Sequence, residues 1–156
     1  MSSAFVANAS PSRTEADVTS DAFWPDIALA EVRSAMRLAG DVTSERLRAA
    51  VVAGVIAVND ELAAWQRQQQ AAGHAQLAEV PAPRIDGRSR LVQLYLRAVH
   101  CAAALEIGER YRSVDATAQG GQRADDMTPT LDELRRDLRH AISDLLGARR
   151  VTVELI

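Results

Sequence analysis

Three histidines and one cysteine are the side chains of this chain that best suit metal binding or nucleophilic catalysis. His74, His100 and His140 fall in separate stretches of the sequence, and Cys101 directly follows His100. Neighbouring residues on a helix point about 100° apart, so His100 and Cys101 cannot easily hold one metal ion. We therefore expect no metal site, and we expect His100 on a helix surface beside a small buried cysteine.

Two acidic pairs, Asp125-Asp126 and Asp132-Glu133, are the candidates for acid–base catalysis. Such catalysis needs a base within hydrogen-bond reach of a reacting group, and the sequence implies no such arrangement. The sequence also contains no glycine-rich phosphate loop, G-x-S-x-G, H-E-x-x-H or C-x-x-C motif. Helix capping and loop solvation explain the acidic pairs better. We predict that the protein is not an enzyme and needs no cofactor.

A short basic and aromatic cluster, Glu109-Arg110-Tyr111-Arg112, could contact nucleic acid. The chain has 18 basic residues, all arginine, and 21 acidic residues, which gives a net charge of −3. Proteins that mainly bind nucleic acid usually carry a basic surplus. Arginines near a helix end more often cap carbonyls or contact another subunit, and we favour that interpretation.

The composition indicates one helical domain. A length of 156 residues fits a single domain, and 47% apolar residues with only 4% aromatic residues favour helix over strand. One cysteine excludes an internal disulfide, so a reducing compartment is expected. No apolar run approaches the roughly 18 residues of a membrane helix, and no signal peptide is visible.

Apolar residues recur every three or four positions in four stretches, which predicts four helices. Residues that can cap a helix precede each stretch, and glycines or a loop follow it. The first predicted helix spans about 27–39, with Asp26 as cap and Gly40 at its end, and the second spans 44–72, with Thr43 or Ser44 as cap and Gly73 at its end. The third has Asp86 or Ser89 as cap and runs to about Tyr111. The fourth has Thr128 as cap, Pro129 as its first residue and Gly147 at its end.

Small residues mark the expected contact between the second and third helices. Gly54 lies in the middle of the second helix, where it costs roughly 1 kcal/mol relative to alanine, so a close approach of another helix would explain it. The run Ala102-Ala103-Ala104 permits such an approach from the third helix. Residues 66–72 are polar and lack a core face, so they lie in solvent or meet another chain.

The chain is expected to divide into three parts. Residues 1–22 are a flexible arm, residues 23–147 a helical domain anchored by the aromatic pair Phe23-Trp24, and residues 148–156 a tail. The tail alternates and is rich in β-branched residues, which predicts a strand with no other strand in the chain to pair with. The expected class is all-α, a four-helix bundle with a long loop between the third and fourth helices and a C-terminal β-strand tail.

A set of short motifs is spread over residues 23–156, and the string from Glu109 to Gly120 is the most specific of them. The motifs are Glu109-Arg110-Tyr111-Arg112, Val114-Asp115-Ala116-Thr117-Ala118 with Gly120, Ala124-Asp125, Asp132-Glu133-Leu134 with Arg136-Asp137, Phe23 with Pro25-Asp26-Ile27, Met36-Arg37-Leu38, Asn59 with Glu61-Leu62, Ala72-Gly73, Val80-Pro81 and Ile85-Asp86-Gly87. In these motifs the chain resembles the head completion protein L (GPL) family of contractile-tailed temperate bacteriophages. The arm before Phe23 does not match, and the family's lysines are arginine or neutral here.

The resemblance implies a structural protein similar to the helical adaptor proteins of other tailed phages. Such a protein joins the portal vertex after DNA packaging, forms a ring that extends the DNA channel, retains the genome and prepares the head for the tail. The implied partners are the portal protein, a neck or tail-completion protein and further copies of the chain, twelve if the ring matches the portal. Packaged DNA lies near without specific contact, no membrane is involved, and the protein passes from the host cytoplasm into the head–tail connector of the virion.

Two segments are the expected contact sites in that role. We expect the tail to dock on the portal by strand addition, through Arg150, Val151, Thr152, Val153, Glu154, Leu155 and Ile156. We expect the end of the third helix and the following loop to contact a neighbouring subunit or border the channel, through Arg110, Tyr111, Arg112, Val114, Asp115, Ala116, Thr117 and Gly120.

Two alternatives stay open on the sequence. A helical DNA-binding or regulatory module would need a basic recognition helix, and the helix that carries Arg135, Arg136 and Arg139 is the candidate. An enzyme with a site assembled from scattered residues has no motif in its favour.

Overall fold

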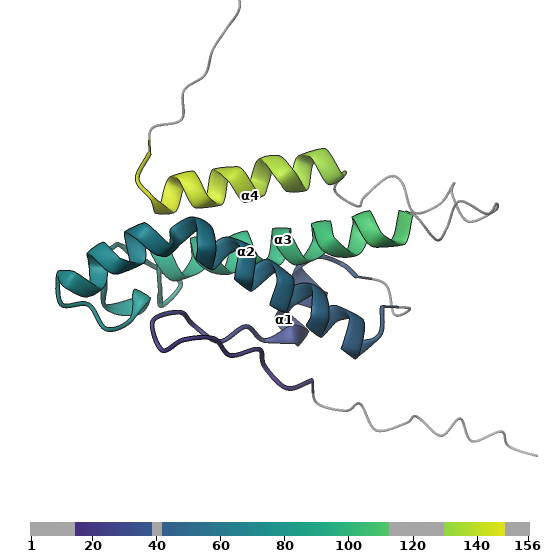
Figure 1. Cartoon of the computed structure of the whole chain (residues 1–156), viewed down its shortest axis with the longest axis horizontal. Coiled ribbons are helices and arrows are strands. Elements are labelled where there is room, and N and C mark those ends of the chain that lie inside the picture. Colours follow the sequence, from purple (N-terminus) through teal and green to yellow (C-terminus); the bar gives the residue numbers. More distant parts are fainter. Residues whose placement is uncertain (1–14, 39–41, 113–129, 149–156) are drawn as a thin grey trace, which may run out of the picture.

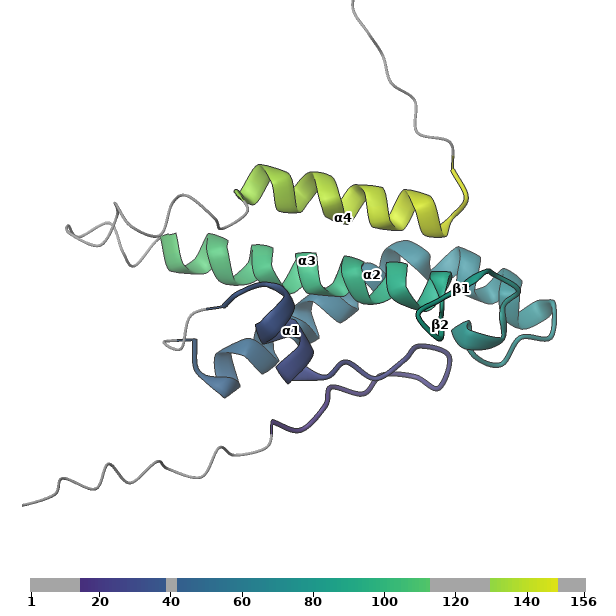
Figure 2. The ribbon, with the colours of Figure 1, turned by 180° about the vertical axis from the view of Figure 1, so that it is seen from behind.

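The computed structural model describes residues 15–38, 42–112 and 130–148, and within these ranges the chain is mostly helical (Figure 1). The central helix is α3, which packs against α2 and runs antiparallel beside α4, as both Figure 1 and Figure 2 show. A short α1 contacts α2, and a turn of 3-10 helix, Leu77–Glu79, follows α2. The helices are α1 (Leu29–Ala35), α2 (Ser44–Ala71), α3 (Arg90–Arg112) and α4 (Leu131–Leu145).

The ends of α2 follow the sequence prediction. Thr43 is the N-cap, and its Oγ1 accepts a hydrogen bond from the backbone nitrogen of Arg46 at 3.3 Å. The helix ends at Ala71, and Gly73 follows with φ = +97°, a left-handed conformation that glycine adopts readily. The second predicted helix is therefore confirmed to within one residue.

The start of α4 differs from the prediction. The N-cap is Thr130, whose Oγ1 accepts from the backbone nitrogen of Glu133 at 3.2 Å, while Glu133 Oε2 accepts from the backbone nitrogen of Thr130 at 2.8 Å. This reciprocal pair is a capping box, which satisfies two backbone donors at once. The predicted cap, Thr128 with Pro129, lies outside the described residues, and the helix begins two residues later than expected.

The first helix is shorter than predicted, because backbone groups at its expected start bond elsewhere. Ile27 and Val18 form an antiparallel bridge in which each backbone N–H donates to the other carbonyl at 2.9 Å. The N-cap is Ala28, without a side-chain hydrogen bond, so the prediction of Asp26 as the cap is wrong. The helix ends at Ala35, ahead of the predicted end at Gly40, which lies outside the described residues.

A β-hairpin between α2 and α3 corrects the all-α prediction. Strands β1 (Arg84–Ile85) and β2 (Arg88–Ser89) pair antiparallel. Asp86 and Gly87 form the turn with φ = +51° and +73°, the positive pair that a type I′ turn requires. The described chain is therefore mostly helical with a small two-stranded sheet.

The hairpin also overturns three smaller expectations. Asp86 lies in the turn and does not cap α3. Ser89 does not cap it either, because its buried Oγ has no hydrogen-bond partner. The statement that the chain has no strand besides its C-terminal one is wrong. The predicted long loop before α4 falls on residues 113–129 and the predicted C-terminal strand on residues 149–156, and both ranges lie outside the described residues.

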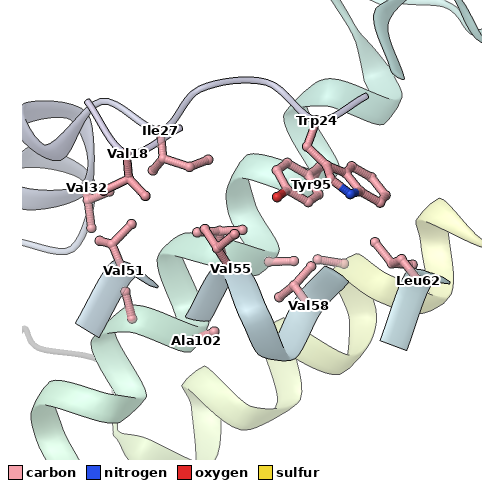
Figure 3. Close-up of a cluster of buried hydrophobic side chains, with 14 of the residues drawn as sticks. Val18, Trp24, Ile27, Val32, Val51, Val55, Val58, Leu62, Tyr95 and Ala102 are labelled. Carbon is pink, nitrogen blue, oxygen red and sulfur yellow. The ribbon is translucent and has the colours of Figure 1, made fainter. Parts of the chain in front are cut away.

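An aromatic cluster anchors the segment before α1 to the bundle. The ring of Trp24 stacks on Tyr95 of α3, with ring centroids 4.5 Å apart and planes at 9° (Figure 3). Phe23 meets Trp24 edge-on at 4.8 Å, and both are buried. The Tyr95 hydroxyl donates to Asn59 Oδ1 of α2 at 2.8 Å, and burial raises the pKa of Tyr95. The predicted Phe23-Trp24 anchor is confirmed.

The core between α2 and α3 is aliphatic and tightly packed. A Cβ built on Gly54 would lie 3.1 Å from the backbone nitrogen of Ala103, 3.2 Å from the Cβ of Ala102 and 3.3 Å from the carbonyl oxygen of Val99. The predicted close contact of Gly54 with the alanine run is confirmed. Figure 3 shows side chains of α2 that line this contact: Val51, Val55, Val58 and Leu62.

The packed part of the chain begins before Phe23, where order was expected to start. Val18 is buried in the main core. Glu15 accepts a hydrogen bond from Arg33 Nη2 of α1 and another from Ser44 Oγ of α2, both at 2.7 Å. These bonds lower the pKa of Glu15, Arg33 having the larger effect. Residues 15–22 therefore belong to the helical domain.

Candidate interaction surfaces

The two segments expected to contact partners attach at opposite ends of α4. Residues 113–129 precede the N-cap Thr130, and residues 149–156 follow Gly147, which lies just after the C-cap Leu146 with φ = +69°. Fifteen helical residues span about 22 Å. The described structure therefore separates the attachment points of the two segments by the length of α4, although it describes neither segment.

Of the predicted loop site, the structure describes one side chain. Arg110 lies in the last turns of α3, 76% exposed, and its Nε forms an ion pair with Glu106 one turn earlier. Tyr111 and Arg112 belong to the last turn of α3 by their backbone, and their side chains are outside the description. The other predicted residues also fall outside the described ranges: Val114, Asp115, Ala116, Thr117 and Gly120, together with the tail residues Arg150, Val151, Thr152, Val153, Glu154, Leu155 and Ile156.

Ion pairs and leucines fix α4 to α3. Arg135 bridges two acidic groups, with Nη2 2.7 Å from Glu109 Oε1 of α3 and Nη1 2.8 Å from Asp132 Oδ1. Arg97 of α3 pairs with Asp137 of α4 at 3.1 Å. Leu134, Ile142 and Leu145 are buried on the inner side of α4. The arginine positions on α4 thus serve in part to hold the two helices in register.

His100 and Cys101 do not form a reactive centre. Cys101 is buried as expected, and burial raises the pKa of its thiol. The prediction that His100 lies on a helix surface is wrong: it is 8% exposed, and its Nε2 has no hydrogen-bond partner. Burial lowers the pKa of His100, which favours the neutral ring. In the described parts of the chain, no three histidine, cysteine or acidic side chains come close enough to hold a metal ion.

Exposed aliphatic side chains are the surface feature that the sequence reasoning missed. Val52 and Ile56 of α2 are 39% and 57% exposed, Ile85 of the hairpin 55% and Leu146 at the end of α4 41%. Val52 and Ile56 are four residues apart and lie on the side of α2 opposite its core stripe. Their spacing was a signal in the sequence, because neither fits the stripe that contains Val51 and Val55.

None of the described helices combines the length and the apolar character needed to cross a membrane.

The chain is similar to structural proteins of phage heads. The profile of the phage head completion protein (GPL) family matches residues 18–156. The head completion/stabilization protein of Escherichia phage P2 is 42% identical over 146 residues, which cover 94% of this chain and 86% of that protein. The probable head completion/stabilization protein of Haemophilus phage HP1 (strain HP1c1) is 24% identical over 139 residues, covering 89% of this chain and 91% of that protein.

No solved structure matches the chain at a significant level. The resemblance inferred from the motifs is confirmed, since the family profile covers most of the chain and a relative well above 30% identity matches nearly all of it. The chain belongs to the phage head completion protein (GPL) family, and it is therefore a structural component of the phage head.

Proposed function

We propose that this protein is the connector adaptor of its phage. It binds the portal after DNA packaging, forms a ring that extends the DNA channel, retains the genome and prepares the head for tail attachment. The observation that carries the proposal is membership of the head completion family over residues 18–156. Its partners in this role are the portal protein, further copies of itself and a neck or tail-completion protein, and its place is the portal vertex of the virion.

The described geometry is compatible with a part that joins two neighbours. A connector must present separate contact areas to the component before it and the component after it. The two candidate contact segments leave α4 at ends about 22 Å apart. The helical backbone of α4 sets that separation, and the ion pairs Arg135–Glu109 and Arg97–Asp137 help to hold α4 against α3. A rigid spacer with a contact segment at each end supports the proposed role.

We assign the portal contact to the tail, residues 150–156. Deleting Val151–Ile156 should abolish binding to the portal, while the helical circular dichroism of the domain stays unchanged, because the deletion begins several residues after α4 ends at Leu145. Co-sedimentation with purified portal measures the binding. Full binding by the truncated protein would exclude this assignment.

We assign the subunit contact or the channel lining to the end of α3 and the following loop, the residues Arg110, Tyr111, Arg112, Val114, Asp115, Ala116, Thr117 and Gly120. Replacing both Asp115 and Thr117 with alanine should reduce ring assembly on the portal, as counted by native mass spectrometry. Monomer helicity should not change, since neither residue belongs to a described helix, α3 ending at Arg112 and α4 beginning at Leu131. Assembly equal to that of the wild type would remove the assignment.

Electron microscopy of the protein mixed with its portal tests the function directly. The expected result is a collar at the narrow end of the portal, with twelve copies if the ring follows the portal's symmetry. A protein that leaves the portal bare under conditions where both partners are folded would refute the proposal.

The alternative of a DNA-binding module makes a different prediction. The arginines of α4 would have to be available to phosphates, and two of the three already have acidic neighbours: Arg135 pairs with Glu109 and Asp132, and Arg136 lies 3.7 Å from Asp137. Phosphate contacts would appear as a salt-dependent gel shift with duplex DNA. We expect no shift at physiological salt, and a specific shift would favour the alternative.

A further inference from the structure

The outward face of α2 carries an exposed stripe that no described part of the chain covers. We call it the α2 stripe: the exposed residues Glu45, Ala49, Val52, Ile56, Asp60 and Arg67, with the half-buried Ala63 between the last two. Its largest apolar side chain, Ile56, is 57% exposed, more than any other large hydrophobic residue of the described chain. Aliphatic side chains repeated along one exposed helix face are typical of a surface that packs on another helix.

The charges at the two ends of the α2 stripe are arranged symmetrically about Ile56, and Asp60 lies at its edge one turn after Ile56. Glu45 precedes Ile56 by eleven residues and Arg67 follows it by eleven. Eleven residues make three helical turns, so the three side chains lie on one face at intervals of about 16 Å. No ion pair among the described residues involves Glu45 or Arg67. Within the described part of the chain, the stripe therefore ends in one unpaired negative charge and one unpaired positive charge.

We propose that two copies of this chain associate through the α2 stripe, with the two helices antiparallel and the two-fold axis at Ile56. In this arrangement Ile56 packs on its symmetry mate, and Glu45 of each copy faces Arg67 of the other. A parallel arrangement would place Glu45 against Glu45 and Arg67 against Arg67, which repel. Charge complementarity thus selects both the occupant, a second copy, and its direction.

The proposed pair is independent of the ring. A two-fold contact uses the same patch on both copies, whereas a closed ring of more than two copies needs two different patches that fit each other. The α2 pairing therefore describes the free protein before it joins the head. Its failure would leave the connector proposal untouched, and the reverse also holds.

The first test compares two matched substitutions of exposed isoleucines. Sedimentation equilibrium over a range of concentrations should show a monomer–dimer equilibrium for the full chain. Ile56→Asp should weaken the dimer by about a hundredfold, because it removes two apolar contacts and places two like charges at the axis. Ile85→Asp, at a hairpin residue 55% exposed, should leave the dimer unchanged. A wild type that stays monomeric, or a dimer that Ile56→Asp does not weaken, would overturn the proposal.

The second test reverses the charges at the ends of the stripe and leaves its apolar residues unchanged. Glu45→Arg alone and Arg67→Glu alone should each weaken self-association about tenfold, since each turns two attractive pairs into repulsive ones. Mixing the two variants should restore association, because in the mixed dimer both pairs become attractive again. The double variant should dimerise like the wild type.

The weakening by each single substitution excludes a parallel pair, in which like charges already face each other and neither substitution changes the number of repulsive pairs, and the mixing result excludes contacts of α2 with a different face. A surface that used α2 against some other face would not be rescued by combining these two variants. Native mass spectrometry of the mixture, with one variant isotopically labelled, identifies the mixed dimer by its mass. Single variants that remain separate after mixing would refute the antiparallel arrangement. Circular dichroism of each variant is the control that its helices are intact.

Discussion

The close contact at Gly54 gives the sharpest test of the packing. Replacing Gly54 with alanine improves the helix propensity of α2 by about 1 kcal/mol. The new methyl group would lie 3.1 to 3.3 Å from three atoms of α3, two of which are backbone atoms of Ala103 and Val99 that cannot rotate away. Overpacking of this kind costs about 1–3 kcal/mol. We therefore expect Gly54→Ala to lower the free energy of unfolding by about 1 kcal/mol overall.

Gly108 of α3 provides the matched control. A Cβ on Gly108 would lie 2.6 Å from Leu131 Cδ2, which is the far end of a half-buried, flexible side chain. That side chain can rotate, so Gly108→Ala keeps most of the propensity gain and should raise the free energy of unfolding by up to about 1 kcal/mol. The same substitution in two helices is thus expected to have opposite signs.

Urea denaturation followed by circular dichroism at 222 nm measures both variants. In a chain of this size, 1 kcal/mol corresponds to roughly 2–4 °C in the melting temperature, which a thermal scan can confirm. Gly54→Val should lower the free energy of unfolding further, by about 3 kcal/mol, because its two added methyl groups meet the same backbone. If Gly54→Ala proved as stabilising as Gly108→Ala, α2 and α3 would not be in backbone contact at this point.

Three further predictions concern hydrogen bonds and pH. Tyr95→Phe leaves the side-chain oxygen Oδ1 of Asn59 without its donor and should cost about 1 kcal/mol in the free energy of unfolding, measured by urea denaturation. Thr130→Ala removes half of the capping box with Glu133 and should cost about 1 kcal/mol by the same assay, a loss that Thr130→Ser should largely avoid. His100 is buried with a lowered pKa, so the unfolded chain binds its proton more tightly, and stability present above pH 6.5 should decline as the pH falls below it. Urea curves at pH 7.5 and 5.5 should show a smaller decline for His100→Leu, and an equal decline would contradict the assignment.

The elements predicted correctly are those specified by local signals. α2 has a capping threonine at one end and a glycine with positive φ at the other, and both act within one turn of the helix. The contact of Gly54 with Ala102 and Ala103 could be predicted as well, because a mid-helix glycine needs a tertiary reason and the alanine run supplied one.

The errors arose where distant parts of the chain compete with a local pattern. The first helix was predicted to begin at Ile27, but the backbone groups of Ile27 bond to Val18, nine residues earlier. The Asp86-Gly87 pair was interpreted as a cap region, although Asp-Gly between two short extended stretches is also the signal of a tight hairpin. Its strands have only two residues each, too few for a periodic pattern to show.

His100 was misplaced for a different reason. The periodicity of α3 indicated one buried face, which is right for a helix that covers a core from one side. However, α3 has α2 and α4 on two sides, and Glu31, Ala35 and Met36 of the α1 region lie beside His100, so residues on nearly every side of α3 are enclosed, including His100 and Cys101. The number of neighbours around a helix is a property of the whole fold, which a stripe within one segment cannot reveal. The candidate contact segments could be named from the motifs, but their partners depend on surfaces outside this chain.

The enclosure of α3 has a consequence for how the molecule opens. Eight consecutive residues, Ala98 to Leu105, are buried, and α2 and α4 both rest on this helix. Amide protons in that stretch can meet solvent only when the surrounding helices separate together. Their deuterium uptake should therefore be the slowest in the described chain and should report global unfolding, whereas the ends of α4 and the hairpin should exchange through smaller, faster openings.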